Sequence, residues 1–405
     1  MGKKYSINAF YSNFFTDKLI AYVCLRITYY FNCTADTTAK AMGVTSDSTV
    51  DKFRHPHIYF DKEHQIEQVI PRIYFDAIPR KFIWPLLRRL LNKDQISTLA
   101  EFRFFRSIRK DAIVYLWPEA SLNLYKKIKS RGCLIVSERI NTLRSNSKEI
   151  LDREYASLHL PICHGISETS AQEEIECMML SDYIFSPSPA VKDSLISVGV
   201  TEDKIIETSY GLKDDEIIQP AVKNPDKEKT VIFVGSICVR KGIHLLLDAW
   251  QKADVKAKLK LVGRIEPEIT ELVKGYLTRN PNIEHRDFVD DLKPIYQDAD
   301  LFILPSLEEG SPLVTYLALG ASLPVIASPM GGGGIIEDGK EGIIIDPHNQ
   351  EDLVRSIRSL ISDDFLRHKM AEASGKKAKE YTWDRVSKKR LEMLLQRISQ
   401  KDTSA

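Results

Sequence analysis

The middle of this 405-residue chain contains the stretch Thr230-Val-Ile-Phe-Val-Gly235, which continues as Ser236-Ile-Cys-Val-Arg-Lys-Gly242. A short β-branched run that ends in glycine is typical of a buried parallel strand. Apolar residues then recur at helical spacing as far as Ala253, which predicts a helix. Strand, loop and helix in this order form the repeating unit of a parallel α/β sheet.

The same unit recurs along the second half of the chain. Further strands are expected at residues 258–263, 283–288, 301–305, 324–327 and 342–346. Helices are expected at residues 267–277, 292–299, 313–320 and 350–361. Repeated βα units of this length predict a doubly wound parallel sheet. Ligands of such sheets bind beyond the carboxyl ends of the strands, so the loops after the strands are the first place to look for chemistry.

The first half of the chain has a weaker pattern. Strands are expected at residues 6–11, 112–117, 133–137, 183–186 and 205–209, whereas residues 12–105 are rich in aromatic side chains and poorly periodic. A length of 405 residues also favours two large domains. We therefore expect a first domain at 1–212, a linker at 213–229, a second domain at 230–382, and a terminal helix at 383–405 that packs back toward the first domain.

Composition narrows the class of protein. Hydrophobic residues make up 43% of the chain and charged residues 28%, as in soluble globular proteins. No apolar run approaches the ~20 residues of a membrane-spanning helix, and the six cysteines form no Cys-x-x-Cys pair. The net charge of +1 argues against general nucleic-acid binding. A cytoplasmic protein with reduced thiols is the expectation.

The charge is unevenly distributed along the chain. Residues 1–131 hold 22 Lys and Arg against 12 Asp and Glu, so the first third is basic. Within it, residues 80–91 mix cations, a tryptophan and leucines in the manner of interfacial helices. We expect a peripheral contact with the inner face of a membrane through this segment. An amphipathic helix packed on its own domain is the alternative.

The loop after the first quoted strand places Arg240 and Lys241 at the start of a helix. A helix N-terminus favours an anion, because its first N–H groups are free and its dipole is positive there. Two cations at this point are suited to a diphosphate. The segment lacks the endings of a P-loop and of a dinucleotide fingerprint, and a solvated basic loop is the competing interpretation.

A second polar stretch, Pro305-Ser-Leu-Glu-Glu-Gly-Ser-Pro-Leu313, follows another expected strand. Glu308 and Glu309 stand beside Gly310, which lets a ligand approach the backbone. Carboxylates there are able to accept hydrogen bonds from sugar hydroxyls. Ser311 is expected to cap the next helix, with Pro312 at its first position. Capping alone explains one acidic residue more easily than two.

A run of four glycines, Gly331 to Gly334, follows the fifth strand of this half. Glycines allow positive φ and bring bare amides toward a charged ligand. A surface turn is the alternative.

Together these stretches resemble one family, the family-4 retaining glycosyltransferases of the GT-B architecture. The resemblance covers most of residues 132–398, and the order and spacing of the motifs carry it more than any single motif. Its anchors are Val234-Gly235, Arg240-Lys241-Gly242, Ala299-Asp300, Leu304-Pro305-Ser306, Glu309-Gly310, Leu323-Pro-Val-Ile-Ala-Ser328, and Glu337-Asp-Gly339 with Glu341-Gly342.

The resemblance implies two Rossmann-like domains that face each other across a cleft, with a nucleotide-sugar donor bound mainly by the second. It implies that Lys241 contacts the donor diphosphate and Glu309 the donor sugar, with Arg240 as a further cation. The implied donor-binding residues are Gly235, Ser236, Gly310, Ser311, Pro312, Leu313 and Leu317.

The sequence departs from the family pattern at several positions. The family places a second glutamate, usually on the ribose, where this chain has Leu317, and commonly an arginine where it has Ser236. A glycine-rich acceptor loop is replaced by the segment that ends in Asn13. Glu138 and Arg139 occupy the site of a histidine that many relatives carry. Glu138, Arg139 and Asn13 are accordingly the expected residues on the acceptor or sugar side.

The resemblance implies a retaining glycosyltransferase that moves a sugar from a nucleotide-sugar donor to a glycan or lipid-linked acceptor, as in bacterial surface polysaccharide synthesis. Cations at the diphosphate would stabilise the leaving group, so neither a metal nor another cofactor is expected. The alternative is a non-catalytic sugar-binding or scaffold subunit of the same fold. A dinucleotide-dependent oxidoreductase is disfavoured by the missing glycine fingerprint.

Overall fold

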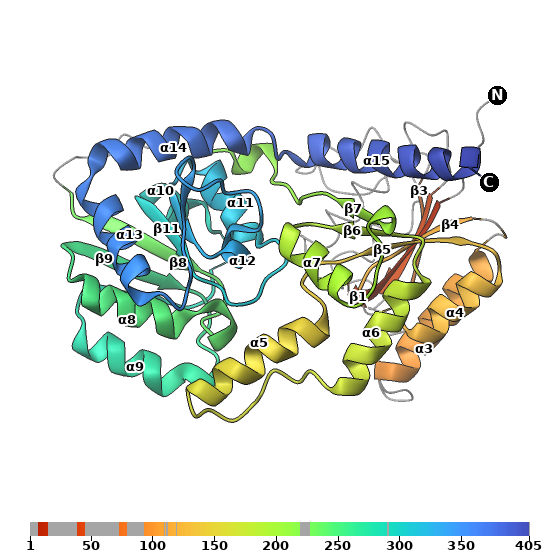
Figure 1. The fold of residues 1–405 in the computed structure, drawn as a ribbon, viewed down its shortest axis with the longest axis horizontal. Coiled ribbons are helices and arrows are strands. Elements are labelled where there is room, and N and C mark those ends of the chain that lie inside the picture. Colours follow the sequence, from red (N-terminus) through yellow and green to blue (C-terminus); the bar gives the residue numbers. More distant parts are fainter. Residues whose placement is uncertain are drawn as a thin grey trace.

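The computed structural model describes residues 7–14, 39–44, 73–78 and 93–404, except 109, 111, 119, 219–226 and 290. These residues form two α/β domains, each built on a parallel sheet (Figure 1). The expected fold class, two doubly wound domains, is therefore confirmed. The segment 80–91 lies outside the described residues, so its expected membrane contact stays a prediction.

The first domain has a seven-stranded sheet in the order β3-β2-β1-β4-β5-β6-β7. All its neighbouring strands pair in parallel. The strands are β1 (Ile7–Phe14), β2 (Ala39–Val44), β3 (Ile73–Ile78), β4 (Ile113–Leu116), β5 (Leu134–Glu138), β6 (Tyr183–Ser186) and β7 (Ile205–Glu207). The helices between them are α3 (Lys93–Ser107), α4 (Leu122–Ser130), α5 (Arg144–Ser157), α6 (Glu168–Leu180) and α7 (Pro189–Ser197).

The second domain has a six-stranded parallel sheet in the order β10-β9-β8-β11-β12-β13. Its strands are β8 (Lys229–Val234), β9 (Ala257–Val262), β10 (Ile283–Arg286), β11 (Leu301–Leu304), β12 (Val325–Ala327) and β13 (Gly342–Ile344). Its helices are α8 (Ile243–Ala253), α9 (Thr270–Arg279), α10 (Lys293–Asp298), α11 (Leu313–Gly320), α12 (Pro329–Gly332), α13 (Gln350–Ser362) and α14 (Asp364–Ala378).

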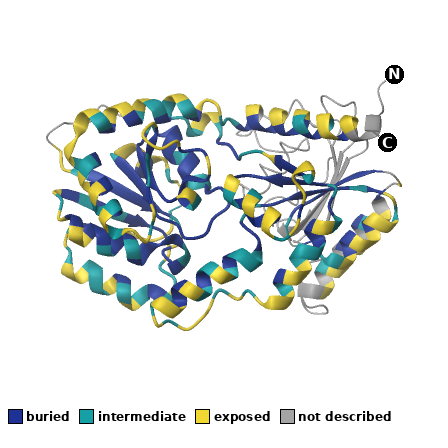
Figure 2. Ribbon diagram, viewed as in Figure 1, coloured by how far each residue is buried: buried dark blue, intermediate teal, exposed yellow. Residues whose placement is uncertain are grey.

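Alternation along β4 shows how the first sheet is buried on both faces. Ile113 and Tyr115 belong to the hydrophobic cluster that also contains the core of the second domain. Val114 and Leu116 belong to a separate cluster under α3, α4 and α7. Because successive side chains of a strand point to opposite faces, this sheet is covered on both sides. Figure 2 shows the resulting pattern, with buried strands and helices exposed on their outer faces.

The last helix, α15 (Trp383–Ser404), runs beside the first domain although α14, just before it, covers the second (Figure 1). The Tyr183 hydroxyl of β6 donates to the carbonyl of Arg397 at 3.0 Å. At the start of α15, Leu212 and Thr382 form a β-bridge. The chain thus crosses between the domains twice at neighbouring points.

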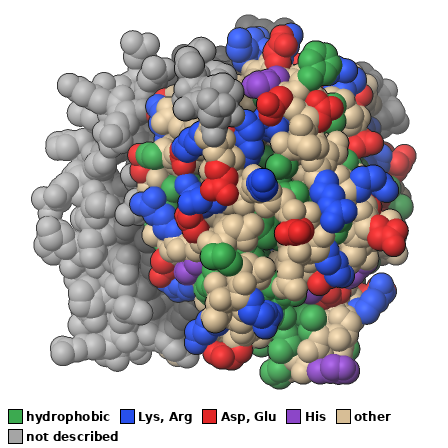
Figure 3. All heavy atoms as spheres, turned by 90° about the vertical axis from the view of Figure 1, so that its left-hand side faces the viewer, with side chains coloured by type: hydrophobic (Ala, Val, Ile, Leu, Met, Phe, Trp, Pro, Cys, Tyr) green, Lys and Arg blue, Asp and Glu red, His purple; other side chains and the backbone are tan. Residues whose placement is uncertain are grey.

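The outer end of the second domain shows basic and acidic side chains intermingled on its surface (Figure 3). Exposed ion pairs of this domain include Lys252 with Asp248 and Lys258 with Glu284. A face of mixed sign does not generate the one-signed field that attracts polyanions. Among the described residues, none of the helices is long and apolar enough to cross a membrane.

Candidate active site

The loop after β8 is shaped by glycines. Gly235 has φ of 138° and Gly242 has φ of 67°, both in the region that favours glycine. A Cβ at Gly242 would stand 2.1 Å from the carbonyl oxygen of Pro305, so a larger residue does not fit there. Between these glycines, residues Val239–Lys241 form a single 3-10 turn that leads into α8. The turn holds Arg240 and Lys241 at the carboxyl edge of the sheet.

The loop after β11 lies against this turn, because β8 and β11 are neighbours in the sheet. The amide of Leu307 donates to the carbonyl of Arg240 at 2.9 Å. The loop then passes Glu308 and Glu309 and enters α11. The two motifs that the sequence singled out separately are thereby joined into one site.

Arg240 and Lys241 both form ion pairs with Glu309. Nη1 of Arg240 lies 2.8 Å from Oε1 of Glu309, and Nζ of Lys241 contacts the same oxygen. Lys241 is 8% exposed and Glu309 is 6% exposed. Burial lowers the pKa of Arg240, but the charges of Glu309 and Glu308 outweigh it and raise that pKa, which keeps the guanidinium charged.

A cleft of about 500 Å³ opens between the two domains beside these groups. Arg240 and Ser236 line it from the second domain, and Arg139 and Asn141 line it from the first. The domains touch at Ile140, which also lines the cleft: a Cβ at Gly310 would stand 1.8 Å from the carbonyl oxygen of Ile140. Glycine at position 310 therefore permits the close approach of the two domains.

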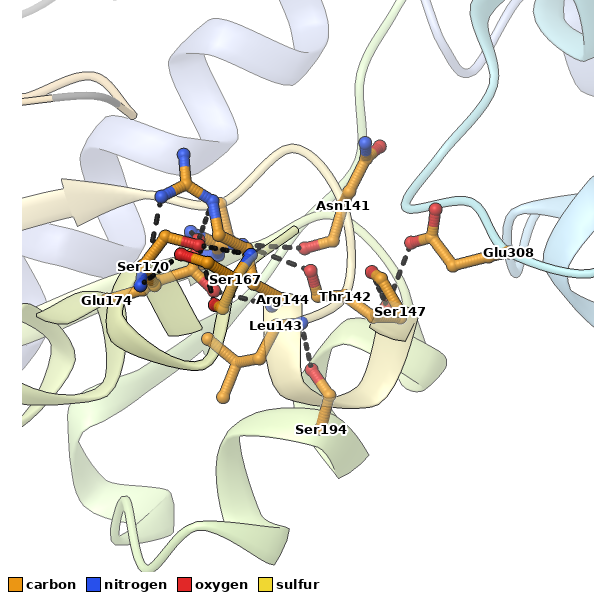
Figure 4. Close-up of polar contacts among 11 residues, drawn as sticks. Asn141, Thr142, Leu143, Arg144, Ser147, Ser167, Ser170, Glu174, Ser194 and Glu308 are labelled. Atoms are coloured by element: carbon orange, nitrogen blue, oxygen red, sulfur yellow. Dashed lines mark hydrogen bonds and ion pairs between the residues drawn. The ribbon is translucent and has the colours of Figure 1, made fainter. Parts of the chain in front are cut away.

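Figure 4 shows the edge of the first domain that faces Glu308. Arg139, directly after β5, pairs with Glu174 of α6 at 2.8 Å. The other carboxylate oxygen of Glu174 accepts from the amide of Arg144 at 2.6 Å, and the amide of Leu143 donates to Ser194 at 3.2 Å. These contacts hold the loop and the first turn of α5 in place. Arg139 lines the cleft, but its charge is largely used to hold this loop, and its expected role toward sugar or acceptor stays a prediction.

Glu138 lies elsewhere than expected. Its side chain has no exposed surface, and its carboxylate contacts Arg390 of α15 and the hydroxyl of Tyr115. Burial raises the pKa of Glu138, although the charge of Arg390 opposes this. Because the carboxylate is enclosed on all sides, it offers no surface to an acceptor. This corrects the expectation from sequence: Glu138 anchors α15 to the first domain.

The structure corrects the expected helix cap at Ser311 and divides the glycine run between a short helix and a turn. Helix α11 begins at Leu313 with Pro312 as its N-cap, and the hydroxyl of Ser311 instead contacts that of Tyr316 at 2.8 Å. Gly331 and Gly332 belong to α12, whereas Gly333 and Gly334 form a turn with φ of 59° and 72°, the positive values that glycine allows. A Cβ at Gly331 would stand 2.0 Å from the carbonyl oxygen of Leu304, so close packing accounts for this glycine.

The remaining predicted residues are dispersed. Half-buried Leu317 lines a separate pocket of about 270 Å³, together with Glu216, Lys293 and Tyr296. Asn13 belongs to β1, and its expected acceptor role stays a prediction. The sequence indicated Glu308 only as a neighbour of Glu309. Its contact with Thr142 joins residues 166 positions apart, which no local pattern reveals.

Known proteins resemble this chain in sequence and in fold. Residues 228–363 match the family model described as glycosyl transferases group 1. The sulfoquinovosyl transferase SQD2 of Arabidopsis thaliana is 28% identical over 50% of this chain and 42% of its own length. The capsular polysaccharide biosynthesis glycosyltransferase CapM of Staphylococcus aureus is 27% identical over 48% of this chain and 56% of its own. The chain spans about half the length of these curated relatives.

Solved structures resemble the chain over nearly its whole length. The sucrose-phosphate synthase of Thermosynechococcus elongatus superposes with a TM-score of 0.66 at 16% identity, covering 99% of this chain and 100% of that one. The Anabaena protein Alr3699/HepE, solved with UDP and glucose, superposes with a TM-score of 0.62 at 15% identity, covering 97% and 100%. At these identities the likeness concerns the fold, and the fold is GT-B.

Proposed function

We propose that this protein is a retaining glycosyltransferase that moves a sugar from a nucleoside-diphosphate sugar to a glycan or lipid-linked acceptor. The observation that carries the proposal is the pairing of Arg240 and Lys241 with Glu309 beside the interdomain cleft. Two cations and a carboxylate at strand ends match a diphosphate and a sugar hydroxyl. No metal or other cofactor takes part in the proposed reaction.

The proposed reaction begins when the diphosphate takes the place of Glu309 on Arg240 and Lys241. Glu309 then accepts hydrogen bonds from the donor sugar. As the bond between the sugar and the diphosphate breaks, negative charge grows on the phosphate, and fixed cations stabilise it. The acceptor hydroxyl attacks on the face that the diphosphate leaves, and the departing phosphate oxygen takes its proton. The first domain, in contact across Gly310, excludes water.

The acceptor is proposed to enter the cleft from the side of Arg139 and Asn141. The name of CapM refers to capsular polysaccharide, which supports a role in bacterial surface glycan synthesis for the present chain. A lipid-linked acceptor would place the protein at the inner face of a membrane, in agreement with the basic first third of the sequence.

A second candidate function is a non-catalytic, sugar-binding or scaffold subunit. It is favoured by Leu317 and Ser236, which stand where the resembling family carries a glutamate and an arginine. Ser236 lines the cleft but brings no charge to it.

Turnover of a panel of nucleotide sugars, compared between the native protein and Lys241→Ala, tests the proposal. We expect the substitution to lower the rate by about 100-fold or more, the scale of one lost transition-state contact. Lys252→Ala is the matched control, because Lys252 lies in the helix after Lys241 and its side chain is 54% exposed. Equal turnover by the native protein and Lys241→Ala would refute the assignment. Ligand-induced melting shifts without turnover of any donor would favour the non-catalytic subunit.

A further inference from the structure

The charges around the proposed diphosphate site cancel. Arg240 and Lys241 contribute two positive charges, and Glu308 and Glu309 contribute two carboxylates within 3.5 Å of these cations. A site of zero net charge attracts a polyanion only weakly, because each carboxylate repels the ligand that the cations attract. In the proposed function Glu309 gains a sugar hydroxyl when the donor enters. Glu308 has no such new partner.

Glu308 is held between the two domains. Its side chain is 2% exposed. Oε1 accepts a hydrogen bond of 2.8 Å from the hydroxyl of Thr142 in the first domain, and Oε2 lies 3.5 Å from Nη1 of Arg240 in the second. Arg240 also donates to the backbone carbonyl of Glu308 at 3.1 Å, so it stays anchored even without the ion pair.

The groups on the first-domain side of Glu308 suit either form of its carboxyl group. The hydroxyl of Thr142 lies 3.1 Å from that of Ser147, and each is able to donate or accept. Toward an ionised carboxylate Thr142 donates, as the structure has it. Toward a protonated carboxyl it accepts and passes its own hydrogen to Ser147. Thr142 and the carboxyl group therefore keep a hydrogen bond to each other in either state.

Burial and the neighbouring charged groups shift the pKa of Glu308. Burial raises the pKa of Glu308, the charge of Arg240 lowers it, and the charge of Glu309 raises it again, with a net shift upward. The same cleft is lined by the ionisable side chains of Arg139, Arg144, His164, Glu174, Glu266 and Glu268. A diphosphate bound at Arg240 adds negative charge and pushes the pKa of Glu308 further upward.

We propose that Glu308 is a positioning residue for Arg240 that takes up one proton from solvent when a nucleotide sugar binds. This inference rests on the proposed function. The proton bonds to Oε1, the new O–H donates to Thr142, and the negative charge beside Arg240 disappears. The guanidinium, still anchored on the backbone carbonyl, then gives its charge to the diphosphate. Donor binding, contact with the first domain and the charge at the phosphate are coupled through this one carboxyl group.

Titration calorimetry measures the proposed proton directly. UDP-glucose is the first probe, because its diphosphate is a diester that stays ionised throughout the pH range of the experiment. If another nucleotide sugar is the one turned over in the panel, that compound replaces it. Heats recorded in two buffers of different ionisation enthalpy give the number of protons taken up between pH 5.5 and 8.5. We expect uptake by the native protein and none by Glu308→Gln, which still binds the probe.

The affinity for the probe supplies a second measurement. Linkage requires the dissociation constant of the native protein to rise with pH, by up to about tenfold per unit where uptake is complete. Glu308→Gln should remove this dependence. Thr142→Val takes a hydrogen-bond partner from both forms of the carboxyl group, but the ionised form loses the stronger, charge-assisted bond, so the dependence should move to higher pH. Glu271→Gln, at an exposed glutamate of the same domain, should behave as the native protein does.

The outcomes separate this inference from the function on which it rests. Buffer-independent heats in the native protein, or equal proton uptake by Glu308→Gln, would overturn the role of Glu308 while leaving the glycosyltransferase in place. If no nucleotide sugar binds or turns over, the proposed function itself fails. Should Glu308→Gln not fold, the shift expected for Thr142→Val decides the matter.

Discussion

Glu138 and Glu309 are buried carboxylates near strand ends, one in each domain, and they are used in opposite ways. Glu138 is the last residue of β5, and Glu309 follows β11 within the next loop. Each is buried and each contacts an arginine. Glu138, however, meets Arg390 from the far end of the chain in a contact with no exposed surface, whereas Glu309 meets Arg240 beside the cleft.

The difference teaches that the partner of a carboxylate at a strand end decides its role. Arg390 lies over the ring of Phe185 at 4.3 Å and donates to the carbonyl of Ser209 at 3.3 Å, so it cannot move to make room for a ligand. The side chain of Arg240 is 31% exposed and is able to exchange Glu309 for another anion. The ion pair of Arg390 with Glu138 is therefore structural, whereas that of Arg240 with Glu309 is able to exchange with a ligand.

The largest effect on stability is expected from breaking the buried ion pair between Arg390 and Glu138. Arg390→Met should lower the free energy of unfolding by about 3–5 kcal/mol, because it leaves the carboxylate of Glu138 buried without its cation. Urea denaturation measures this loss. The turnover of the folded fraction should stay unchanged, since Arg390 lies outside the cleft.

Two controls sharpen this test. Lys389→Met changes the neighbouring residue, which is exposed on the same helix, and should have almost no effect. Combining Arg390→Met with Glu138→Leu should recover part of the lost stability, because no uncompensated charge remains. Equal stability of Arg390→Met and Lys389→Met would mean that the pair does not hold α15 in place.

At Glu309 we expect the opposite pattern, a large loss of turnover with little loss of stability. Glu309→Gln should reduce turnover by about 100-fold, equivalent to roughly 2.7 kcal/mol of transition-state stabilisation. Its unfolding free energy should change far less, since the amide keeps an acceptor for Arg240 and Lys241. Initial rates with a saturating donor check the first statement and urea denaturation the second. Glu372→Gln, an exposed glutamate of α14, is the control, and a variant as active as this control would contradict the role of Glu309.

The two glutamates also show how much of the structure and the site can be predicted from the sequence. The strands of the second domain and most of its helices lie close to their expected bounds, because each βα unit carries its own pattern of apolar residues. Helices α12 and α14 were not expected from the sequence. Short motifs in a fixed order mark Arg240, Lys241 and Glu309 in the sequence. The expected position of each was a strand end, and proximity followed from the order of strands in the sheet.

What the sequence did not reveal depends on contacts between distant residues. Glu138 and Arg390 lie 252 positions apart, so nothing near Glu138 shows that its charge is already taken. Strands β2 and β3 and helix α3 fall in the aromatic-rich stretch where no period was recognised. The pairing of Thr142 with Glu308 exists only once the two domains meet. Tertiary contacts of this kind override local patterns.

Glu154 of α5 is an intermediate case, buried as Glu138 is but reaching into the other domain as Glu308 does. Its Oε1 lies 2.6 Å from Nε2 of His244 in α8, and His348 lies 3.6 Å from its other oxygen. Burial raises the pKa of Glu154, but the hydrogen bond from His244 and the two histidine charges outweigh it, so the pKa is lowered. A carboxylate with a lowered pKa stabilises the fold above its unfolded pKa.

The smallest effect is therefore expected from Glu154→Gln. It should cost about 1 kcal/mol of unfolding free energy at pH 7, the scale of one hydrogen bond. The difference from the native protein should shrink as the pH falls below about 4, because the native carboxylate then takes up a proton and loses its advantage. Glu149→Gln, at an exposed position of the same helix, should show no such pH dependence. A difference that stays constant with pH would mean that Glu154 acts through its shape rather than its charge, as a packed side chain between two domains.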